Sequence, residues 1–275
     1  MSRLIHKLVR QIARANKRFD LIEDGDHVMV AISGGKDSWG MLDLLRRYRE
    51  RAPFDFTLTA VNVDQGHPGF PVHVLRAYFE ANGYAYRIES QDTHSVVVEN
   101  TPEGKAYCAL CSRMRRGILY KVADEIGATK IALGHHRDDL IETLLLNLFF
   151  SGRTRAMSPR LNSLTGQPAV IRPLALCAEA HLAELAVEQE YPVVPCDLCG
   201  SQENLQRQQM KALLAQLEVN NPALRGNLLA ALGNVEPSHL LDARLKRVEA
   251  DDLPPPVVDD EELIQLIEPA PQNQV

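Results

Sequence analysis

The chain of 275 residues lacks any run of 18 apolar residues, which excludes an ordinary membrane-spanning helix. Its first 20 residues are charged and lack an apolar stretch with a cleavage site, so we expect no secretory signal. No internal repeat is apparent, which argues against a solenoid. These absences predict a cytoplasmic protein. In that compartment the five cysteines are expected to bind metal or act in catalysis rather than form disulfides.

Basic residues are also absent from the end of the chain, since neither Lys nor Arg occurs after Arg247. Residues 1–248 carry 28 acidic and 30 basic residues, a net charge of about +2, whereas the whole chain carries −6. The net charge of this part is compatible with nucleic-acid binding without requiring it. The acidic, proline-containing end is predicted to be disordered.

Apolar runs alternate with segments of helical periodicity along most of the chain. Strands are predicted over residues 27–33, 57–63, 84–89, 130–133 and 170–173, and helices over 3–18, 37–50, 71–82, 113–126, 138–150, 180–190 and 203–217. This alternation predicts an α/β fold with a mostly parallel, doubly wound sheet and added helices at both ends. The predicted division is a basic helix over 1–22, a catalytic domain over 23–220, a helical segment over 221–250 and the acidic tail over 251–275.

The sequence Ser-Gly-Gly-Lys-Asp-Ser at 33–38 lies between a predicted strand and a predicted helix. Glycines permit a tight turn there, and the amides at the start of the helix favour an anion. A Walker loop is excluded, because Val30 replaces its first glycine and Asp37 replaces its Ser or Thr. The motif resembles the PP-loop of the N-type ATP pyrophosphatases. That resemblance implies an adenine nucleotide alpha hydrolase-like fold and cleavage of ATP between the α and β phosphates.

Two further segments follow predicted strands and should converge on this loop, namely residues 64–66 and 134–142. Lys36 is expected to neutralise phosphate charge in the transition state. Asp37 and Asp139, the latter in a pair with Asp138, are expected to hold Mg²⁺. The predicted catalytic residues are Lys36, Asp37 and Asp139. The predicted ATP-binding residues are Ala31, Ser33, Gly34, Gly35, Lys36, Asp37, Ser38, Asp64 and Gly134.

Two simpler interpretations remain open at these positions. Asp138 and Asp139 also suit the first turn of a helix, where acidic side chains favour the helix dipole. Asp64 also suits a turn. The neighbouring His135 and His136 are interpreted as structural or loop residues rather than metal ligands.

Two Cys-x-x-Cys pairs are present, Cys108 with Cys111 and Cys196 with Cys199. Two pairs indicate a metal or cluster site, and their spacing leaves a structural Cys₄ zinc and an iron–sulfur cluster as alternatives. The fifth cysteine, Cys177, lies in an apolar segment and is interpreted as buried and uninvolved.

The phosphate loop, the segment 108–120 and the segment 195–208 together resemble the tRNA-cytidine(32) 2-sulfurtransferase family (TtcA) over roughly residues 5–220. The resemblance implies ATP, Mg²⁺ and a [4Fe–4S] cluster held by Cys108, Cys111 and Cys199. It also implies a tRNA substrate, a homodimer and a cysteine desulfurase as sulfur donor. The expected activity is thiolation of cytidine 32 after adenylation of its O2 atom.

Basic residues beside these motifs are the expected RNA phosphate contacts. They are Lys7, Arg10, Arg14, Arg113, Arg115, Arg116, Arg153, Arg155 and Arg207. Alternatives of the same chemistry are thiolation of a tRNA uridine and ligation through an adenylated intermediate. The absence of terminal zinc knuckles favours cytidine over uridine, and the cysteine set argues against ligation. An alternative of another class is a non-catalytic, zinc-stabilised RNA-binding module.

Overall fold

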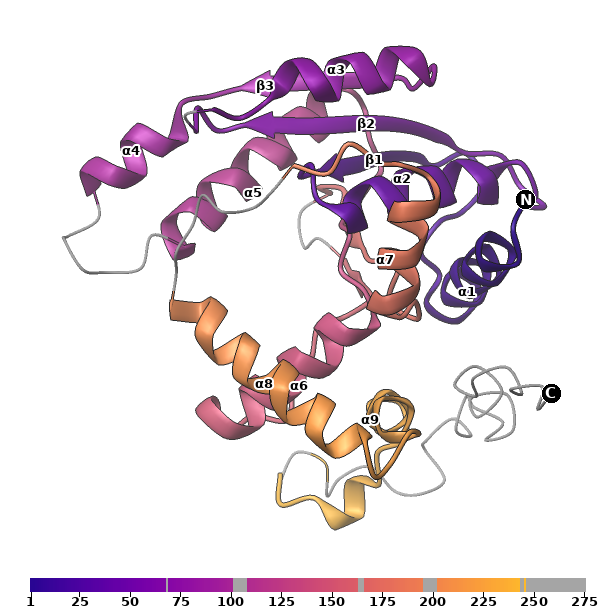
Figure 1. The fold of residues 1–275 in the computed structure, drawn as a ribbon, viewed down its shortest axis with the longest axis vertical. Coiled ribbons are helices and arrows are strands. Elements are labelled where there is room, and N and C mark those ends of the chain that lie inside the picture. The colour runs from indigo at the N-terminus through magenta and orange to yellow at the C-terminus, as the bar shows by residue number, and fades with distance from the viewer. Residues whose placement is uncertain (68, 101–107, 163–165, 195–201, 243–244, 246–275) are drawn as a thin grey trace. The chain divides into compact units, whose positions relative to one another are not determined.

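The computed structural model describes residues 1–67, 69–100, 108–162, 166–194, 202–242 and 245. Six strands form one sheet in the order β3-β2-β1-β4-β6-β5 (Figure 1). The strands are β1 (His27–Ile32), β2 (Thr57–Asp64), β3 (Tyr86–Ser90), β4 (Lys130–Ala132), β5 (Arg160–Leu161) and β6 (Ala169–Ile171). All neighbours run parallel except β5, which pairs antiparallel with β6 at the edge. The predicted α/β fold with a mostly parallel sheet is therefore confirmed.

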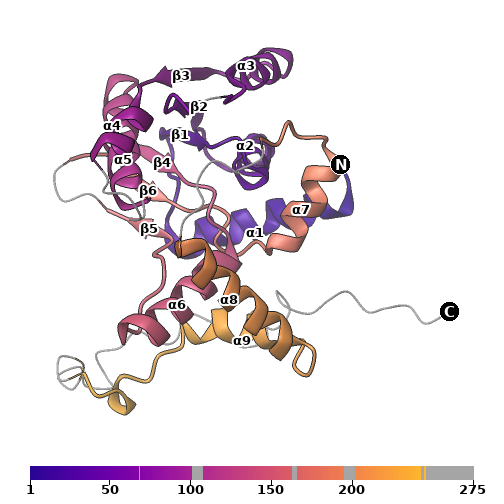
Figure 2. The same cartoon turned by 60° about the vertical axis from the view of Figure 1, so that its left-hand side comes forward.

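The helices are α1 (Arg3–Phe19), α2 (Lys36–Arg49), α3 (Val72–Ala81), α4 (Thr93–Asn100), α5 (Cys108–Glu125), α6 (Arg137–Ser151), α7 (Glu179–Glu188), α8 (Gln202–Glu218) and α9 (Leu224–Ala231), with a short 3₁₀ turn at Pro237–His239. Figure 2 shows α4 and α5 on one side of the strands and α1, α2 and α7 on the other. Helices on both faces explain why residues 28–32 of the central strand β1 are all apolar rather than alternating with polar residues. No helix in the described ranges has both the length and the apolar character needed to cross a membrane.

One core cluster lies between α5 and the sheet. Met29, Val61 and Ile131 come from three neighbouring strands, and each is at most 2% exposed. Ile118 and Val122 of α5 pack against them, because helical residues four apart share a face. This packing fixes one face of α5 toward the sheet, at the edge where the strands end.

Three elements differ from the sequence-based expectation. Helix α5 begins at Cys108, five residues before the predicted start, so the first cysteine pair lies in its first turn. Helix α4 was not predicted, because its consecutive valines favour a strand. Asp92 stabilises the start of this helix by accepting a hydrogen bond from the Ser95 amide at 2.9 Å. The two-residue strand β5 is too short to show a pattern.

The chain forms two compact units. The first contains Met1–Asp139 and Met157–Leu205, and therefore the whole sheet. The second contains Leu140–Ala156 and the described part of Gln206–Val275, and its core joins Ile141 and Leu145 of α6 to Met210 and Leu214 of α8. The predicted division at residues 22, 220 and 250 stays a prediction.

Candidate active site

The phosphate loop is a tight turn between β1 and α2. Gly34 has a φ of +88°, a conformation that glycine adopts without steric cost. The Ser38 hydroxyl donates to the Gly35 carbonyl oxygen at 2.8 Å and accepts from the Ser33 amide at 3.2 Å. Gly35 is the N-cap of α2 and has no side chain to cap the first amides. The start of α2 therefore retains the amide donors and the dipole that favour a phosphate group.

Gly134 allows the end of β4 to approach this loop closely. A Cβ atom on Gly134 would lie 3.2 Å from the Ser38 amide nitrogen and 3.3 Å from the Asp37 carbonyl carbon. Both neighbours are backbone atoms, which have little freedom to move. A side chain at this position would therefore require a backbone shift at the start of α2, and glycine lets the segment after β4 approach the phosphate loop.

A cavity of about 610 Å³ opens beside the phosphate loop, entirely within the first unit. Its volume suits a nucleotide-sized ligand. Six of the predicted ATP-binding residues line it: Ala31, Ser33, Gly35, Asp37, Ser38 and Gly134. Gly34, Lys36 and Asp64 do not line it. The sequence analysis included Gln65 only within the converging segment 64–66, and it missed His67 and Phe70 after β2 and Arg172 directly after β6.

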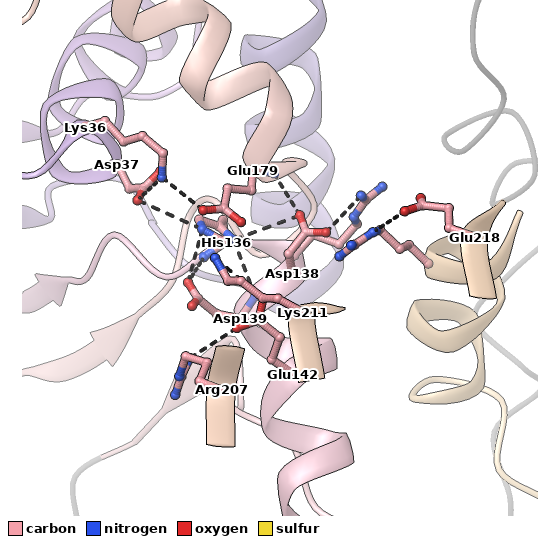
Figure 3. A network of polar contacts seen from close by, with 12 residues as sticks. Lys36, Asp37, His136, Asp138, Asp139, Glu142, Glu179, Arg207, Lys211 and Glu218 are labelled. Atoms are coloured by element: carbon pink, nitrogen blue, oxygen red, sulfur yellow. Dashed lines mark hydrogen bonds and ion pairs between the residues drawn. The ribbon is translucent and has the colours of Figure 1, made fainter. Parts of the chain in front are cut away.

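Lys36 is held in an ion-pair network (Figure 3). Its Nζ atom lies 2.8 Å from Asp37 Oδ2 and 3.2 Å from Glu179 Oε1 at the start of α7. Burial alone would lower the pKa of Lys36, but the hydrogen bonds and charges of Asp37 and Glu179 outweigh it and raise that pKa. Lys36 is therefore a stable cation next to the phosphate loop, and Glu179 is a partner that no motif indicated.

The acidic pair at the start of α6 has two different environments. Asp138 is 3% exposed, and its Oδ2 accepts a hydrogen bond from the Glu179 amide at 2.7 Å. Asp138 therefore supports the start of α7, a structural role that differs from the helix-dipole role considered from the sequence. Asp139 lines the cavity, and its Oδ2 accepts from the His136 amide at 3.0 Å.

Asp37 and Asp139 approach the same imidazole. Their Oδ2 atoms lie 3.9 Å and 3.5 Å from Nε2 of the buried His136. Among the described residues no group of three His, Cys, Asp or Glu side chains is arranged to bind a metal. Two carboxylates suffice for Mg²⁺ only when phosphate oxygens complete its coordination, so this pair fits a magnesium–nucleotide complex.

Asp64 takes the turn role that the sequence left open. Its Oδ1 accepts a hydrogen bond from the Gly66 amide at 3.0 Å, and its Oδ2 lies 3.5 Å from the Ser90 hydroxyl. These contacts stabilise the turn after β2.

One stripe of α5 borders the cavity. Arg115, Arg116 and Leu119 line it, and positions 108 and 111 precede Arg115 on the same helical stripe at spacings of three and four residues. The first cysteine pair is thus placed one to two turns before cavity-lining residues. Cys196 and Cys199 lie outside the described residues. Cys177 is buried, and burial raises the pKa of its thiol to about 12, as expected for an uninvolved cysteine.

The residues before the second cysteine pair are fastened to α2. The Trp39 indole donates to the Pro192 carbonyl oxygen at 3.2 Å, and the Tyr191 hydroxyl donates to Asp43 Oδ2 at 2.9 Å. Both hydrogen bonds are at least partly buried. They hold the residues that follow α7 beside α2, the helix that follows the phosphate loop.

The predicted RNA contacts occur in both units. Arg10, Arg14, Arg113, Arg115, Arg116, Arg153 and Arg155 are exposed. Lys7 contacts His181 of α7, with Nζ and Nε2 3.1 Å apart. In the second unit, Arg207 and Lys211 of α8 lie 3.6 Å and 3.8 Å from the carboxylate of the buried Glu142. Their role in RNA binding stays a prediction.

Comparison with known proteins places these features in a family. Residues 4–216 match the model of a PP-loop domain. The chain is 56% identical over 242 residues to a tRNA-cytidine(32) 2-sulfurtransferase of Sorangium cellulosum, covering 88% of this chain and 86% of that protein. It is 54% identical over 244 residues to the protein of that name from Burkholderia mallei, covering 89% and 74%.

Among solved structures, the fold is similar to the U34-tRNA thiolase NcsA from Methanococcus maripaludis with its [4Fe-4S] cluster. The TM-score is 0.65 at 22% identity, and the match covers 90% of this chain and 80% of that one. This likeness supports the fold. The match to the PP-loop model and the high identity to curated relatives confirm the resemblance seen in the motifs: the chain belongs to the tRNA-cytidine(32) 2-sulfurtransferase family of PP-loop enzymes.

Proposed function

We propose that this enzyme performs the ATP-dependent 2-thiolation of cytidine 32 in tRNA. Membership of the family supports the reaction and the substrate. The observation that carries the proposal is the cavity, which is lined by the phosphate loop, including Asp37, and by Asp139. Such a site suits a magnesium nucleotide and leaves room for a base beside it.

In the first step, the cytosine O2 atom attacks the α phosphorus of ATP. The bond between this phosphorus and its bridging oxygen breaks, and pyrophosphate leaves with its electron pair. Charge that develops on the phosphates is stabilised by the amides at the start of α2 and by Lys36. Asp37 and Asp139 would hold the Mg²⁺ that neutralises the leaving group.

In the second step, a sulfur nucleophile adds to C2 of the activated base, and the C2–O2 bond breaks to release AMP. Cys108, Cys111 and Cys199 would hold a [4Fe–4S] cluster, which would supply the sulfur nucleophile. Thiolates are the usual ligands of such a cluster, and positions 108 and 111 lie in the first turn of α5, one to two turns before Arg115, which lines the cavity. Confinement beside the base raises the effective concentration of the nucleophile.

The target base must leave its loop to enter the cavity, as single-stranded RNA bases commonly do on proteins. The exposed arginines of α1 and α5 would bind the flanking phosphates. A cysteine desulfurase would renew the sulfur, and the enzyme would act as a homodimer in the cytoplasm. These partners follow from the family rather than from contacts in the structure.

Anaerobic reconstitution with iron and sulfide tests the cluster. We expect a broad visible absorption and about four irons per chain, both lost in Cys108→Ser and Cys199→Ser. Cys177→Ala is the matched control and should keep the cluster, because its thiol is buried and belongs to neither Cys-x-x-Cys pair. Stoichiometric zinc without a chromophore, or a Cys199→Ser protein that keeps cluster and activity, would contradict the ligand assignment.

A second assay tests the reaction. The reconstituted enzyme is incubated with ATP, a sulfur source and either the natural tRNA or the same tRNA with uridine at position 32. We expect AMP, pyrophosphate and 2-thiocytidine only with the natural tRNA. Thiolation of a uridine elsewhere in both tRNAs would assign the enzyme to the alternative substrate.

A further inference from the structure

Arg172 is a buried cation that the proposed reaction has not used. It directly follows β6, and its side chain lines the cavity that contains the phosphate loop. Only 8% of the residue is exposed to solvent. In the parallel register Ala132 of β4 faces Ile171, so Arg172 lies one residue beyond the sheet, at the level where β4 leads into Gly134.

The contacts of Arg172 do not neutralise its charge. Its Nη1 donates to the Ser158 carbonyl oxygen, and its amide donates to the Pro159 carbonyl oxygen at 2.8 Å. Its Nε is buried and has no hydrogen-bond partner within the described ranges. No carboxylate of these ranges forms an ion pair with its guanidinium within 4.0 Å. Burial lowers the pKa of Arg172, and the charge of Asp139 opposes that effect at longer range.

A buried guanidinium without a paired carboxylate is costly unless a ligand supplies the negative charge. The two other arginines that line the cavity, Arg115 and Arg116, are exposed and meet solvent. Lys36, which the proposed reaction already assigns to the phosphates, is paired with the carboxylates of Asp37 and Glu179. Arg172 is therefore the deeply placed cation of this cavity that best suits a bound anion.

We propose that Arg172 binds the triphosphate of ATP from the β6 side and holds the pyrophosphate as it leaves. β6 is two strands from β1, so the backbone of Arg172 lies roughly 10 Å from the backbone of the phosphate loop. The Arg172 side chain and a triphosphate bound at the loop can together span this distance. Arg172 also lies near enough to Asp139 to feel its charge. Arg172 is therefore on the side of the cavity where the proposed magnesium would contact phosphate. This inference rests on the proposed function, since it assumes that the cavity binds ATP.

An RNA phosphate is the competing anion, and the observations favour ATP. The RNA backbone must stay near the mouth of the cavity while only the target base enters. A residue that is 8% exposed suits a ligand bound inside the cavity, whereas the exposed Arg115 and Arg116 suit the mouth.

Calorimetric titration of the full chain, without tRNA, tests the proposal. The ligands are AMP and an ATP analogue with a methylene bridge between the α and β phosphorus atoms. In Arg172→Gln we expect binding of the analogue to weaken roughly tenfold to hundredfold and binding of AMP to change little. Arg172→Lys keeps the charge but loses the planar fork, so it should weaken the analogue less. Arg49→Gln, at the exposed end of α2, should bind as the wild type does.

The outcomes separate the inference from the proposed function. If the wild type fails to bind the analogue, the proposed function fails with it. If the wild type binds but both Arg172 variants bind equally well, only the inference fails. An equal loss of affinity for AMP and for the analogue would indicate a structural role through Ser158. Reduced tRNA binding with normal analogue binding would assign Arg172 to RNA. Either result overturns the proposal. If Arg172→Gln does not fold, the analogue-to-AMP ratio of Arg172→Lys decides.

Discussion

The backbone amide of Val194 donates a hydrogen bond to the carbonyl oxygen of Gly34, with the two atoms 3.0 Å apart. This bond joins the phosphate loop to a residue that precedes Cys196 by two positions. The Val194 side chain also lies 3.1 Å from where a Cβ of Gly34 would be. The segment that precedes the second cysteine pair is therefore anchored on the phosphate loop.

Gly34→Ala should weaken both the fold and nucleotide binding. The φ of +88° would cost an alanine about 1–2 kcal/mol of unfolding free energy, and contact with Val194 would add to that cost. Gly25→Ala is the matched control, because Gly25 has a φ of +79° and no atom within 4 Å of its Cβ position. Denaturant unfolding and ATP-analogue titration of both variants measure the difference. Equal losses of unfolding free energy and of analogue affinity in the two variants would show that the Val194 contact is unimportant.

Gly134→Ala should impair ATP binding without a φ penalty. The new Cβ would press on backbone atoms of Asp37 and Ser38 at 3.2–3.4 Å, and the start of α2 must shift to relieve the contact. Because phosphate binding depends on the direction of these amides, we expect the affinity for the analogue to fall at least about tenfold. Gly117→Ala, in the middle of α5 with no atom near its Cβ position, should keep that affinity and gain up to about 1 kcal/mol of stability.

Asp138→Asn should mainly reduce stability, whereas Asp139→Asn should mainly reduce activity. Asp138→Asn weakens a buried charge-assisted hydrogen bond to the Glu179 amide and should cost about 1–3 kcal/mol of unfolding free energy. Asp139→Asn should change stability less but reduce magnesium-dependent release of pyrophosphate at least about tenfold. Thermal unfolding and a pyrophosphate assay distinguish them. A stable, inactive Asp138→Asn protein with a fully active Asp139→Asn protein would reverse the assignment.

The contact between Lys7 and His181 should make stability depend on pH. Burial, followed by the charges of Lys7 and Arg137, lowers the pKa of His181. The folded state therefore prefers neutral imidazole, and stability should be complete above the unfolded pKa of 6.5 and decline as the pH falls below it. Unfolding midpoints at about pH 7.5 and about pH 5 test this. His181→Asn should lose less stability between the two pH values than the wild type does; an identical pH response would exclude His181 as its source.

Much of the fold was predictable because its signals are local. The parallel sheet follows from apolar strands that alternate with amphipathic helices, and this pattern needs no knowledge of distant contacts. Helix α4 was missed because its valines favour a strand, while the Asp92 contact that supports its first turn depends on the loop after β3. The helix predicted over 113–126 likewise left out the first cysteine pair, although α5 already begins at Cys108.

Within the site, the sequence by itself determined the phosphate loop, the carboxylates after β4 and the spacing of the cysteines, because each is encoded in consecutive residues. Only the tertiary structure decided that Asp139 faces the cavity while Asp138 holds the start of α7. It also decided that Glu179 pairs with Lys36 and that Arg172 enters the cavity. The two contacts of Glu179, with Asp138 and with Lys36, join residues 41 and 143 positions apart, and no local pattern specifies them. They arise when packing of the strands and helices brings their ends to one edge of the sheet.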